Sequence, residues 1–577
     1  YLVSPRWNQR AAIDRSFYHD AGDYFKFDPG FLILEQQVTP MRKTVQPYGL
    51  SGDRLGFLIG GRSLSPFEHS IEPDGLCDLN DIPTALDHKV AILPGPVGMV
   101  LGGRHATATL LTQPGNPDST PSQSAFVVDK GSFGYSYARG KYSKRFTGGR
   151  EIDMSIGYRV AEGPAWNRYD NAYHYTADLY FPAGQTMGFR ANGWLYARGG
   201  PVQVRPDIGG DYINRNRIDR YVQLSWVAHD DDHQRKYEFG YRHWHQGSTI
   251  SRDYEAWLRT TENELFLSRE WIAGQVALKA EVSGDHFEYN NWHQVHTRLS
   301  GGSGFSLAWL AKPWTAAIDL RQRYVDGYKF LPSSSAMMSR ESERLFFMLA
   351  VGYSERAPSL HELHLPYQAA SIYNFSEVDY ADGGYANLVS ERQLIGSAEI
   401  KLGTIDNCLG VSVTGGRIKD GIDWYRELHG DTSIFSPING DIDFGTVTGR
   451  ARIGLGDILH LNGGGSYHFL EYEHYEDKSF SPEYQCFSGL EMHVYWPQKL
   501  IHFYAYGEFV YTGPYHGYRQ TNLGNVGLLN LKFSFRMGDF RFHWVIQNAT
   551  SSVYSARDYI RFPGRYNYFG FTWDFLD

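Results

Sequence analysis

Apolar and polar residues alternate along much of this chain, and the pattern is clearest near its C-terminal end. Residues 529–536 read Leu-Asn-Leu-Lys-Phe-Ser-Phe-Arg, and after the short turn Met537–Asp539 residues 540–546 read Phe-Arg-Phe-His-Trp-Val-Ile. Residues 569–575 repeat the pattern. Successive side chains of a β-strand point to opposite faces, so this spacing predicts paired antiparallel strands with one apolar face. A soluble sandwich buries such a face, whereas a membrane barrel turns it toward lipid.

The polar face of these strands carries charge, which favours the barrel. In residues 236–242, Lys, Glu and Arg alternate with Tyr, Phe and Tyr. Charged groups on an inner face cost little when the lumen holds water or polar protein. We therefore expect one set of side chains to face lipid, Phe533, Phe535, Phe542, Trp544, Phe571 and Trp573, and another to face the lumen, Lys532, Arg536 and Arg541.

The connections between the predicted strands alternate in length. Short ones are expected near residues 147–149, 182–185, 229–234, 272–274, 311–313, 339–343, 404–407, 455–457, 497–499 and 537–539, and longer ones near 162–172, 199–216, 246–254, 356–390, 427–441, 472–482, 513–523 and 549–564. Short periplasmic turns and long external loops are typical of an outer-membrane barrel. The pattern predicts about 22 strands, the number associated with plugged transporters. A soluble propeller is the alternative, but no repeat of blade length is present.

Composition removes several other classes of protein. The 577 residues are 15% aromatic, with 41 Tyr and 62 Gly, and carry a net charge of −9. No apolar run approaches the length of a membrane-spanning helix, and an acidic chain argues against nucleic acid as the main partner. The scattered cysteines Cys77, Cys408 and Cys486 form neither a disulfide framework nor a metal motif. Tyr1 is not followed by a signal-peptide pattern, so we expect a signal peptide to have been removed.

The first 123 residues differ from the rest. Alternation weakens there and Gly and Pro become frequent, which predicts a separate domain at 1–123 followed by the barrel at 124–577. Three ordered segments stand out. Residues 21–31 contain Ala-Gly-Asp-Tyr-Phe and Asp-Pro-Gly-Phe, residues 49–64 contain Gly-Leu-Ser-Gly-Asp-Arg and Phe-Leu-Ile-Gly-Gly-Arg-Ser-Leu, and residues 78–103 contain Asp-Leu-Asn-Asp-Ile-Pro, Val-Ala-Ile-Leu-Pro-Gly-Pro and Leu-Gly-Gly.

This ordered series resembles the plug domain of TonB-dependent outer-membrane receptors. The third segment is similar to that family's "DLNxIP…IEVLRGPxSxLYG" stretch. In the barrel, residues 354–363 (Ser-Glu-Arg-Ala-Pro-Ser-Leu-His-Glu-Leu), 385–392, 547–550 and 563–565 resemble further family motifs. The resemblance implies an all-β, 22-stranded barrel closed by an N-terminal plug, in which a scarce ligand is imported with energy from an inner-membrane TonB-type partner. The plug motif residues it implies are Gly49, Gly61, Asp78, Asn80, Pro83, Gly95, Pro96 and Gly102.

The chain departs from the family at charged plug positions. Tyr48, Gly60, Ala91 and Pro94 stand where the family has Arg, Asp, Glu and Arg. Buried charges persist only when paired, so we expect a plug held mainly by hydrogen bonds and packing. No convincing TonB box lies upstream of Ala21. These departures favour an alternative, in which a transport-inactive barrel serves as a structural or docking subunit of an envelope complex.

Candidate ligand contacts are fewer. His361 and His364 flank Glu362 where a long loop begins, and two imidazoles with a carboxylate suit a transition metal or haem iron. With Arg356 and Tyr48, these form the predicted substrate-binding set, although polar packing within the loop is the favoured explanation. His243 and His245 share a face with Tyr237 and its neighbours, which favours a membrane-interface role over a metal site. No catalytic triad or carboxylate pair appears, so neither an enzyme nor a resident cofactor is expected. The transported ligand is expected to be a metal chelate or haem.

Three interpretations remain open at this point: an energised importer, a structural subunit and a passive porin. A domain of this size inside the lumen disfavours the porin, because it blocks free diffusion.

Overall fold

A computed structural model of the chain describes most of its residues. These are residues 8–9, 20–26, 28–35, 43–64, 78–82, 84, 87–104, 107–114, 123–162, 170–205, 211–230, 234–251, 255–291, 294–364, 387–404, 407–429, 432–473, 480–517, 522–557, 560–562 and 564–576.

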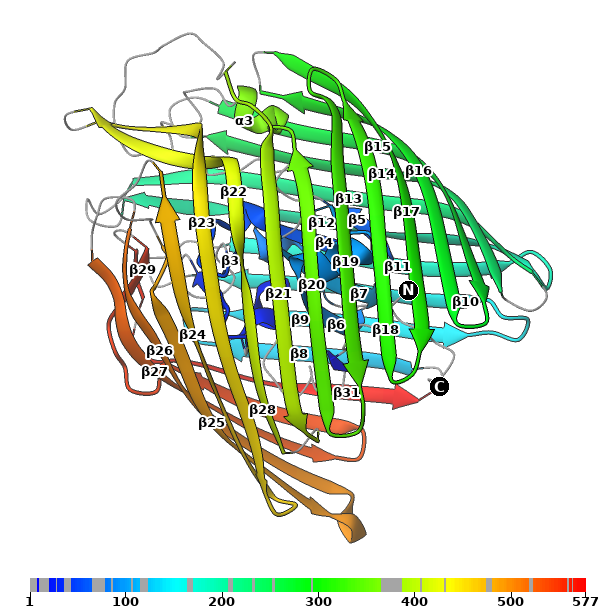
Figure 1. Ribbon diagram of the computed structural model, residues 1–577. Coiled ribbons are helices and arrows are strands. Elements are labelled where there is room, and N and C mark those ends of the chain that lie inside the picture. The colour runs from blue at the N-terminus through cyan, green and yellow to red at the C-terminus, as the bar shows by residue number, and fades with distance from the viewer. Residues whose placement is uncertain are drawn as a thin grey trace.

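Twenty-two antiparallel strands close into one barrel, as the sequence predicts (Figure 1). Each strand pairs with its neighbour in sequence, and β31 pairs with β8 to close the ring. The strands are β8 (Gln123–Gly131), β9 (Ser136–Arg145), β10 (Glu151–Ala161), β11 (Asp170–Pro182), β12 (Met187–Arg205), β13 (Asp211–His229), β14 (Arg235–Ser251), β15 (Glu255–Ala273), β16 (Val276–Asn290), β17 (Val295–Ala311), β18 (Trp314–Val325), β19 (Lys329–Glu341), β20 (Leu345–Arg356), β21 (Glu391–Gly403), β22 (Cys408–His429), β23 (Thr432–Leu455), β24 (Leu459–Tyr472), β25 (Tyr484–Trp496), β26 (Ile501–His516), β27 (Asn522–Met537), β28 (Phe540–Gln547) and β31 (Tyr566–Leu576). Outside the ring lie the one-turn helix α3 (Leu360–His364), η5 (Pro497–Lys499) and the small hairpin β29 (Ser555–Arg557) and β30 (Ile560–Arg561).

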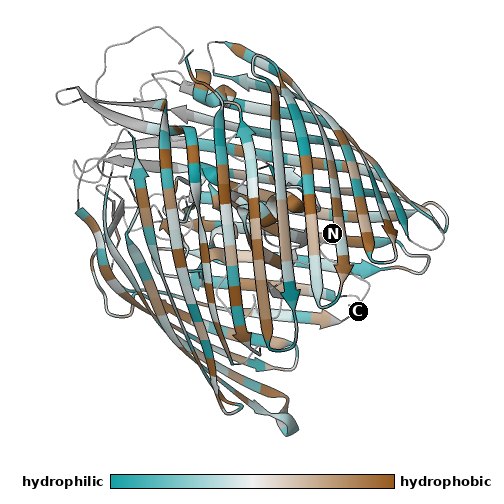
Figure 2. Cartoon of the chain, in the orientation of Figure 1, coloured by the Kyte–Doolittle hydropathy of each residue, from teal (hydrophilic) through white to brown (hydrophobic). Residues whose placement is uncertain are grey.

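The C-terminal hairpin has the predicted register. Phe533 lies opposite Trp544 and Phe535 opposite Phe542, and the turn between them needs a left-handed residue, which Gly538 supplies at φ 57°. Phe535, Phe542, Trp544 and Trp573 are exposed on the barrel exterior, whereas Lys532 is buried inside. The predicted facing is therefore confirmed for these side chains. Figure 2 shows the same alternation of apolar and polar positions along the strands around the barrel.

The short connections also lie where they are predicted, but several predicted long loops are wrong. Residues 199–205 and 211–216 belong to β12 and β13, and 427–429 and 432–441 to β22 and β23, so these hairpins extend far past the apolar band. Much of 246–254 likewise belongs to β14. These segments contain many Gly, Pro, Asn, Asp and Ser residues, which are typical of loops, even though their backbone is paired.

A small mixed domain fills the barrel lumen, and we call it the plug (Figure 1). A five-stranded sheet in the order β1-β6-β7-β4-β5 forms its centre, next to the hairpin β2-β3. Its elements are β1 (Asn8–Gln9), η1 (Ala21–Phe25), β2 (Phe31–Glu35), β3 (Lys43–Pro47), η2 (Gly52–Arg54), β4 (Leu55–Ile59), β5 (Arg62–Leu64), η3 (Leu79–Asp81), β6 (Asp87–Pro94), α2 (Gly95–Val100) and β7 (Ala108–Pro114). Among the described helices, none combines the length and apolar character needed to cross a bilayer.

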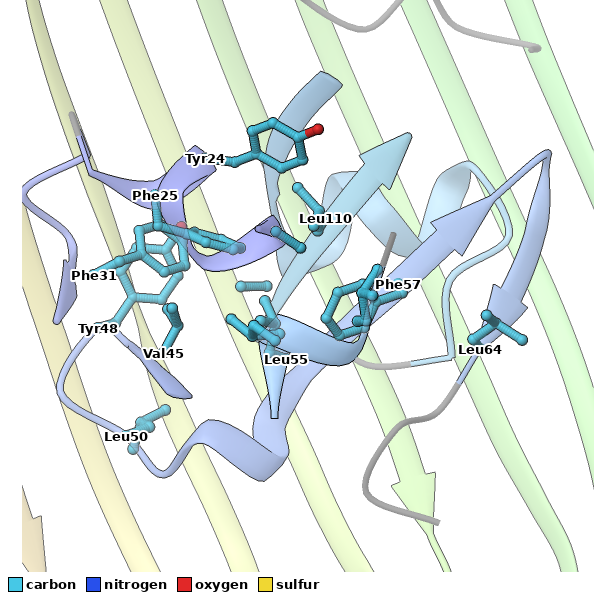
Figure 3. Close-up of a cluster of buried hydrophobic side chains, with 14 of the residues drawn as sticks. Tyr24, Phe25, Phe31, Val45, Tyr48, Leu50, Leu55, Phe57, Leu64 and Leu110 are labelled. Carbon is cyan, nitrogen blue, oxygen red and sulfur yellow. The ribbon is translucent and has the colours of Figure 1, made fainter. Parts of the chain in front are cut away.

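The core of the plug is aromatic and aliphatic. Phe25, Phe31 and Tyr48 pack together, with the Phe31 ring centroid 4.9 Å from that of Phe25 and 5.1 Å from that of Tyr48. Figure 3 shows these rings beside Val45 and Leu55, with Phe57 and Leu110 farther along the sheet. Wall side chains such as Trp244, Ile395 and Phe444 belong to the same buried cluster, so the plug shares its hydrophobic core with the inner face of the barrel.

The residues of the plug motif have structural roles. Gly49, Gly61 and Gly102 adopt positive φ angles of 78°, 83° and 106° at turns. Asp78 accepts a hydrogen bond from the Asn80 backbone N–H at 3.1 Å and so caps η3. Gly95 and Pro96 begin α2, where a proline that lacks an N–H leaves no donor unsatisfied. Pro83 lies outside the described residues.

Candidate functional site

Four of the five residues in the predicted ligand set, all but Tyr48, lie where β20 leaves the barrel wall, at the end of the barrel that carries α3 (Figure 1). Ser359 and Glu362 form a capping box, in which the Ser359 N–H donates to Glu362 Oε2 at 2.6 Å and the Glu362 N–H donates to Ser359 Oγ at 3.1 Å. This local motif folds α3 as a single turn. Arg356 Nη1 then contacts both carboxylate oxygens of Glu362 at 2.9 Å, which ties α3 to the strand before it.

Arg356 also belongs to a buried charge cluster between the plug and the wall. Arg54 of the plug donates to Glu391 of β21 at 2.6 Å, and Arg356 Nη2 lies 3.5 Å from the other oxygen of Glu391. Asp53 of the plug lies 3.6 Å from Arg356. Burial raises the pKa of Asp53 to about 6, although Arg54 and Arg356 oppose the shift. The cluster joins the plug, one wall strand and the start of the long loop.

The two histidines of the set point to different neighbours. The ring of His361 is fully buried and meets Tyr289 edge-on at 5.7 Å and Trp424 at 5.6 Å. His364 instead stacks on His296 of β17, with ring centroids 3.7 Å apart. Burial lowers the pKa of His364 to about 4, so its ring is neutral at pH 7. His361, Glu362 and His364 therefore do not converge on one point.

Tyr48 lies apart from this group. It sits in the plug core with φ 55°, and its carbonyl oxygen accepts a hydrogen bond from Thr446 Oγ1 at 3.3 Å. Across the described residues, no group of three or more His, Cys, Asp or Glu side chains is arranged to hold a metal ion.

A polar cavity beside Arg356 separates the plug from the wall. The cavity is open to solvent, and its empty volume, which includes part of that solvent space, is about 830 Å³. Gly102 and Arg104 of the plug face Gly302 and Gly304 of β17 across it, and the wall adds Arg321 and Arg323, among other lining residues. The two wall glycines lie opposite these arginines in the strand register, so the absence of side chains there leaves room for the guanidinium groups.

The sequence predicts a plug held mainly by hydrogen bonds and packing, and this prediction missed several buried ion pairs between the plug and the wall. Arg62 of the plug contacts Glu264 at 3.1 Å and Glu281 at 2.9 Å, and Asp78 contacts Arg198 at 3.0 Å. Tyr48, Gly60, Ala91 and Pro94 are neutral, but other plug residues carry the charge. Arg54 and Arg62 lie within the plug segments that stand out in the sequence, and Glu264 and Glu281 lie at inward positions of predicted strands. The charged residues were therefore visible in the sequence, but nothing in it shows which arginine pairs with which carboxylate.

Comparison with known proteins adds a fold-level match. No family model and no curated protein matches the sequence. The structure matches the copper transporter OprC over 97% of this chain and 96% of that one, with a TM-score of 0.80 and 13% identity. It matches a point mutant of the ferric enterobactin receptor PfeA from Pseudomonas aeruginosa over 99% of this chain and 98% of that one, with a TM-score of 0.78 and 11% identity. It matches the F3-3 variant of the FrpB iron transporter from Neisseria meningitidis over 99% of both chains, with a TM-score of 0.76 and 12% identity.

This chain has the fold of the TonB-dependent receptors. At such low identity the likeness concerns the barrel and the plug, and it says nothing of individual contact residues.

Proposed function

We propose that this protein is an integral outer-membrane receptor that imports a scarce small ligand, such as a metal chelate or haem, with energy from an inner-membrane TonB-type partner. The proposal is supported by the shared fold and by the names of the neighbours, a copper transporter, a ferric enterobactin receptor and an iron transporter. An apolar exterior and a charged interior suit a barrel that spans lipid.

The observation that carries the proposal is the way in which the plug is attached. Breaking a buried ion pair by removing one partner leaves an uncompensated charge and costs about 3–5 kcal/mol. Arg54, Arg62 and Arg104 each contact a wall carboxylate. Free diffusion past such a plug is unfavourable, so passage of a ligand requires work on the plug. An inner-membrane energy source fits this requirement, and a passive porin does not.

Within the predicted ligand set, we assign different roles to different residues. Arg356 and Glu362 hold α3 against the wall, and Tyr48 and His361 pack in buried surroundings. His364 and His296 form a half-buried stack at the mouth, and neutral imidazoles are good ligands for transition metals. We therefore expect the His296–His364 stack to contact the ligand while the other residues support the loop.

Uptake in cells tests this function. Cells without receptors of their own would express the protein and be supplied with radiolabelled ferric or cupric chelates, with the TonB-type partner present or deleted. Partner-dependent uptake of at least one chelate is expected. His296→Ala with His364→Ala should lower that uptake, and His286→Ala on the barrel exterior serves as the matched control.

A pull-down with the periplasmic domain of the partner provides the second arm. Specific capture of the full mature protein is expected, with loss on deleting residues upstream of Ala21. Failure of both capture and uptake by the full mature protein would favour the structural-subunit alternative. That alternative drew support from the neutral plug positions, and the ion pairs at other positions weaken this ground.

A further inference from the structure

The barrel exterior carries a polar patch on β13, β14 and β15, which are labelled in Figure 1. Along β13 the outward positions Val222, Leu224 and Trp226 are apolar and exposed, but the outward position before them is Arg220. Along β15, Leu265 and Leu267 are likewise exposed and are preceded on the same face by Thr261 and Arg259. Two arginines therefore interrupt the apolar exterior at neighbouring levels of these strands, with Ile218 exposed beyond Arg220.

A notch lies at the centre of this patch. Gly247 of β14 faces outward between Ile218 of β13 and Arg259 of β15. A Cβ atom at Gly247 would lie 3.5 Å from His245 Nε2 and 3.7 Å from Arg259 Cγ. These are ordinary contact distances, so the glycine leaves a space bordered by an imidazole nitrogen and the stem of an arginine.

The side chains around the notch are held in position. His245 Nδ1 lies 3.0 Å from Thr261 Oγ1, and this contact turns its Nε2 toward Gly247. The guanidinium of Arg259 lies over the Trp257 ring, 4.5 Å from its centroid. Arg220 stands opposite His245 in the register, so the two arginines flank β14 from strands that are roughly 10 Å apart.

The charge of the patch is positive. Arg220 and Arg259 provide two permanent cations, and His245 can add a third donor. Glu288 of β16, opposite Thr261, is the neighbouring carboxylate on the same outward face. Guanidinium groups bind phosphate oxygens through paired hydrogen bonds. The notch therefore suits one phosphate group better than a neutral head group.

The position of the patch along the strands points to a lipid. Short connections lead from the end of β13 to β14 and from the end of β15 to β16, at the strand ends far from the notch, and short connections predict the periplasmic side. The notch thus lies toward the external side, directly above the exposed apolar strip formed by Leu224, Tyr241 and Leu265. A molecule bound here meets a phosphate site next to a surface that suits acyl chains.

We propose that this notch binds the phosphate group of an anionic lipid of the outer leaflet, through Arg220, His245 and Arg259. The lipid would sit on the wall with its chains along the apolar strip. This role does not depend on whether the barrel transports a ligand.

Native mass spectrometry of the full chain in detergent tests the proposal. The probes are a bis-phosphorylated lipid A, phosphatidylethanolamine and inorganic phosphate. Arg220→Gln and Arg259→Gln should each lower lipid A retention roughly fivefold, since one cation near a lipid surface contributes about 1 kcal/mol. Gly247→Val should also lower it by filling the notch with a β-branched side chain.

Two matched controls make the result decisive. Arg269→Gln removes an outward arginine at the other end of β15, where it lies over Tyr237, and Gly284→Ala adds a side chain on the exterior of β16. Both should retain lipid A as the wild type does, and phosphatidylethanolamine retention should be the same in every variant. Equal retention by Arg220→Gln and wild type, or an equal loss with Arg269→Gln, would overturn the site. Displacement of lipid A by millimolar inorganic phosphate would overturn the lipid as its occupant.

Discussion

The plug meets the barrel wall in two different ways on its two sides. Toward β15, β16 and β21, arginines of the plug contact wall carboxylates, as with Arg62 and Glu281 at 2.9 Å. Toward β23, β24 and β25, wall side chains donate to carbonyl oxygens of the plug backbone, as with Thr446 and Tyr48 at 3.3 Å. The second side also has one ion pair, between Arg450 and Asp28, so the two sides differ in which kind of contact predominates.

The charged interface therefore depends on which side chains the plug carries, whereas the other interface depends mainly on where the plug places its backbone carbonyl groups. A buried ion pair is sensitive to the loss of either partner, because the remaining charge is left in a poor solvent. A neutral hydrogen bond to a carbonyl contributes only about 1 kcal/mol and survives many substitutions on the plug. The charged side should therefore dominate both the stability and the pH response of the plug.

The largest expected effect comes from Arg54→Ala on the charged side. It leaves Glu391 with a single arginine partner, and plug unfolding should become easier by about 3–5 kcal/mol. Chemical denaturation in detergent, followed by protease sensitivity of the plug, measures this change. Arg417→Ala removes an exposed pair with Asp441 and should cost less than about 1 kcal/mol. Equal effects of the two substitutions would show that burial between the plug and the wall adds nothing to the strength of an ion pair.

The free-energy cost of an unpaired charge in lipid provides a reference for the cost of breaking a buried ion pair. Phe542→Arg places a guanidinium on the lipid-facing exterior and should cost about 2–4 kcal/mol near the bilayer midplane. Folding into lipid vesicles, compared with Phe542→Leu, measures the cost. Wild-type folding of Phe542→Arg would show that this face does not meet lipid.

The next effect is the pH dependence of stability that Asp53 gives to the charged side of the plug. Its folded pKa is about 6, above the ordinary value of 3.8, so the folded state binds this proton more tightly. The stability that this proton contributes is fully present below pH 4 and is lost as pH rises from about 4 to 6, amounting to about 3 kcal/mol at most. Unfolding measured across this range for wild type and Asp53→Asn should give a difference that changes with pH, whereas a constant difference would contradict the shift.

The smallest effect is expected on the neutral side. Thr446→Val removes the donor to the Tyr48 carbonyl with little change in shape and should cost about 1 kcal/mol. The denaturation assay used for Arg54→Ala measures it, with Ser303→Ala on the barrel exterior as the control. A loss as large as that of Arg54→Ala would mean that both sides of the plug depend equally on their polar contacts.

The predictions from sequence succeeded for features that depend on neighbouring residues and failed for contacts between residues far apart in sequence. Strand facing follows from adjacent residues, so the positions of Phe542 and Trp544 could be predicted from the alternation alone. The family resemblance named Gly49 and Gly102 as plug-motif residues, and both lie at turns with positive φ angles, which glycine adopts without strain. The pairing of Arg54 with Glu391 could not be predicted, since these residues are far apart in sequence and meet only when the plug enters the barrel.

The candidate site shows the same limit. The capping box of Ser359 and Glu362 is a local signal and could have been recognised from the sequence. By contrast, His364 was expected near His361 but stacks on His296, a partner from another strand. The outer parts of the hairpins β12–β13 and β22–β23 were mistaken for loops, because they contain many Gly, Pro, Asn, Asp and Ser residues, which are typical of loops.

The sequence by itself determined the period of the strands, the face that each side chain takes and the turns of the plug, because all of these depend on residues within a few positions of one another. Only the tertiary structure decided which plug arginine meets which wall carboxylate, where the cavity beside Arg356 opens and how Arg220, Gly247 and Arg259 come together on the exterior. Those arrangements depend on strand register and on the position of the plug in the closed barrel. Neither can be predicted from a local pattern of residues.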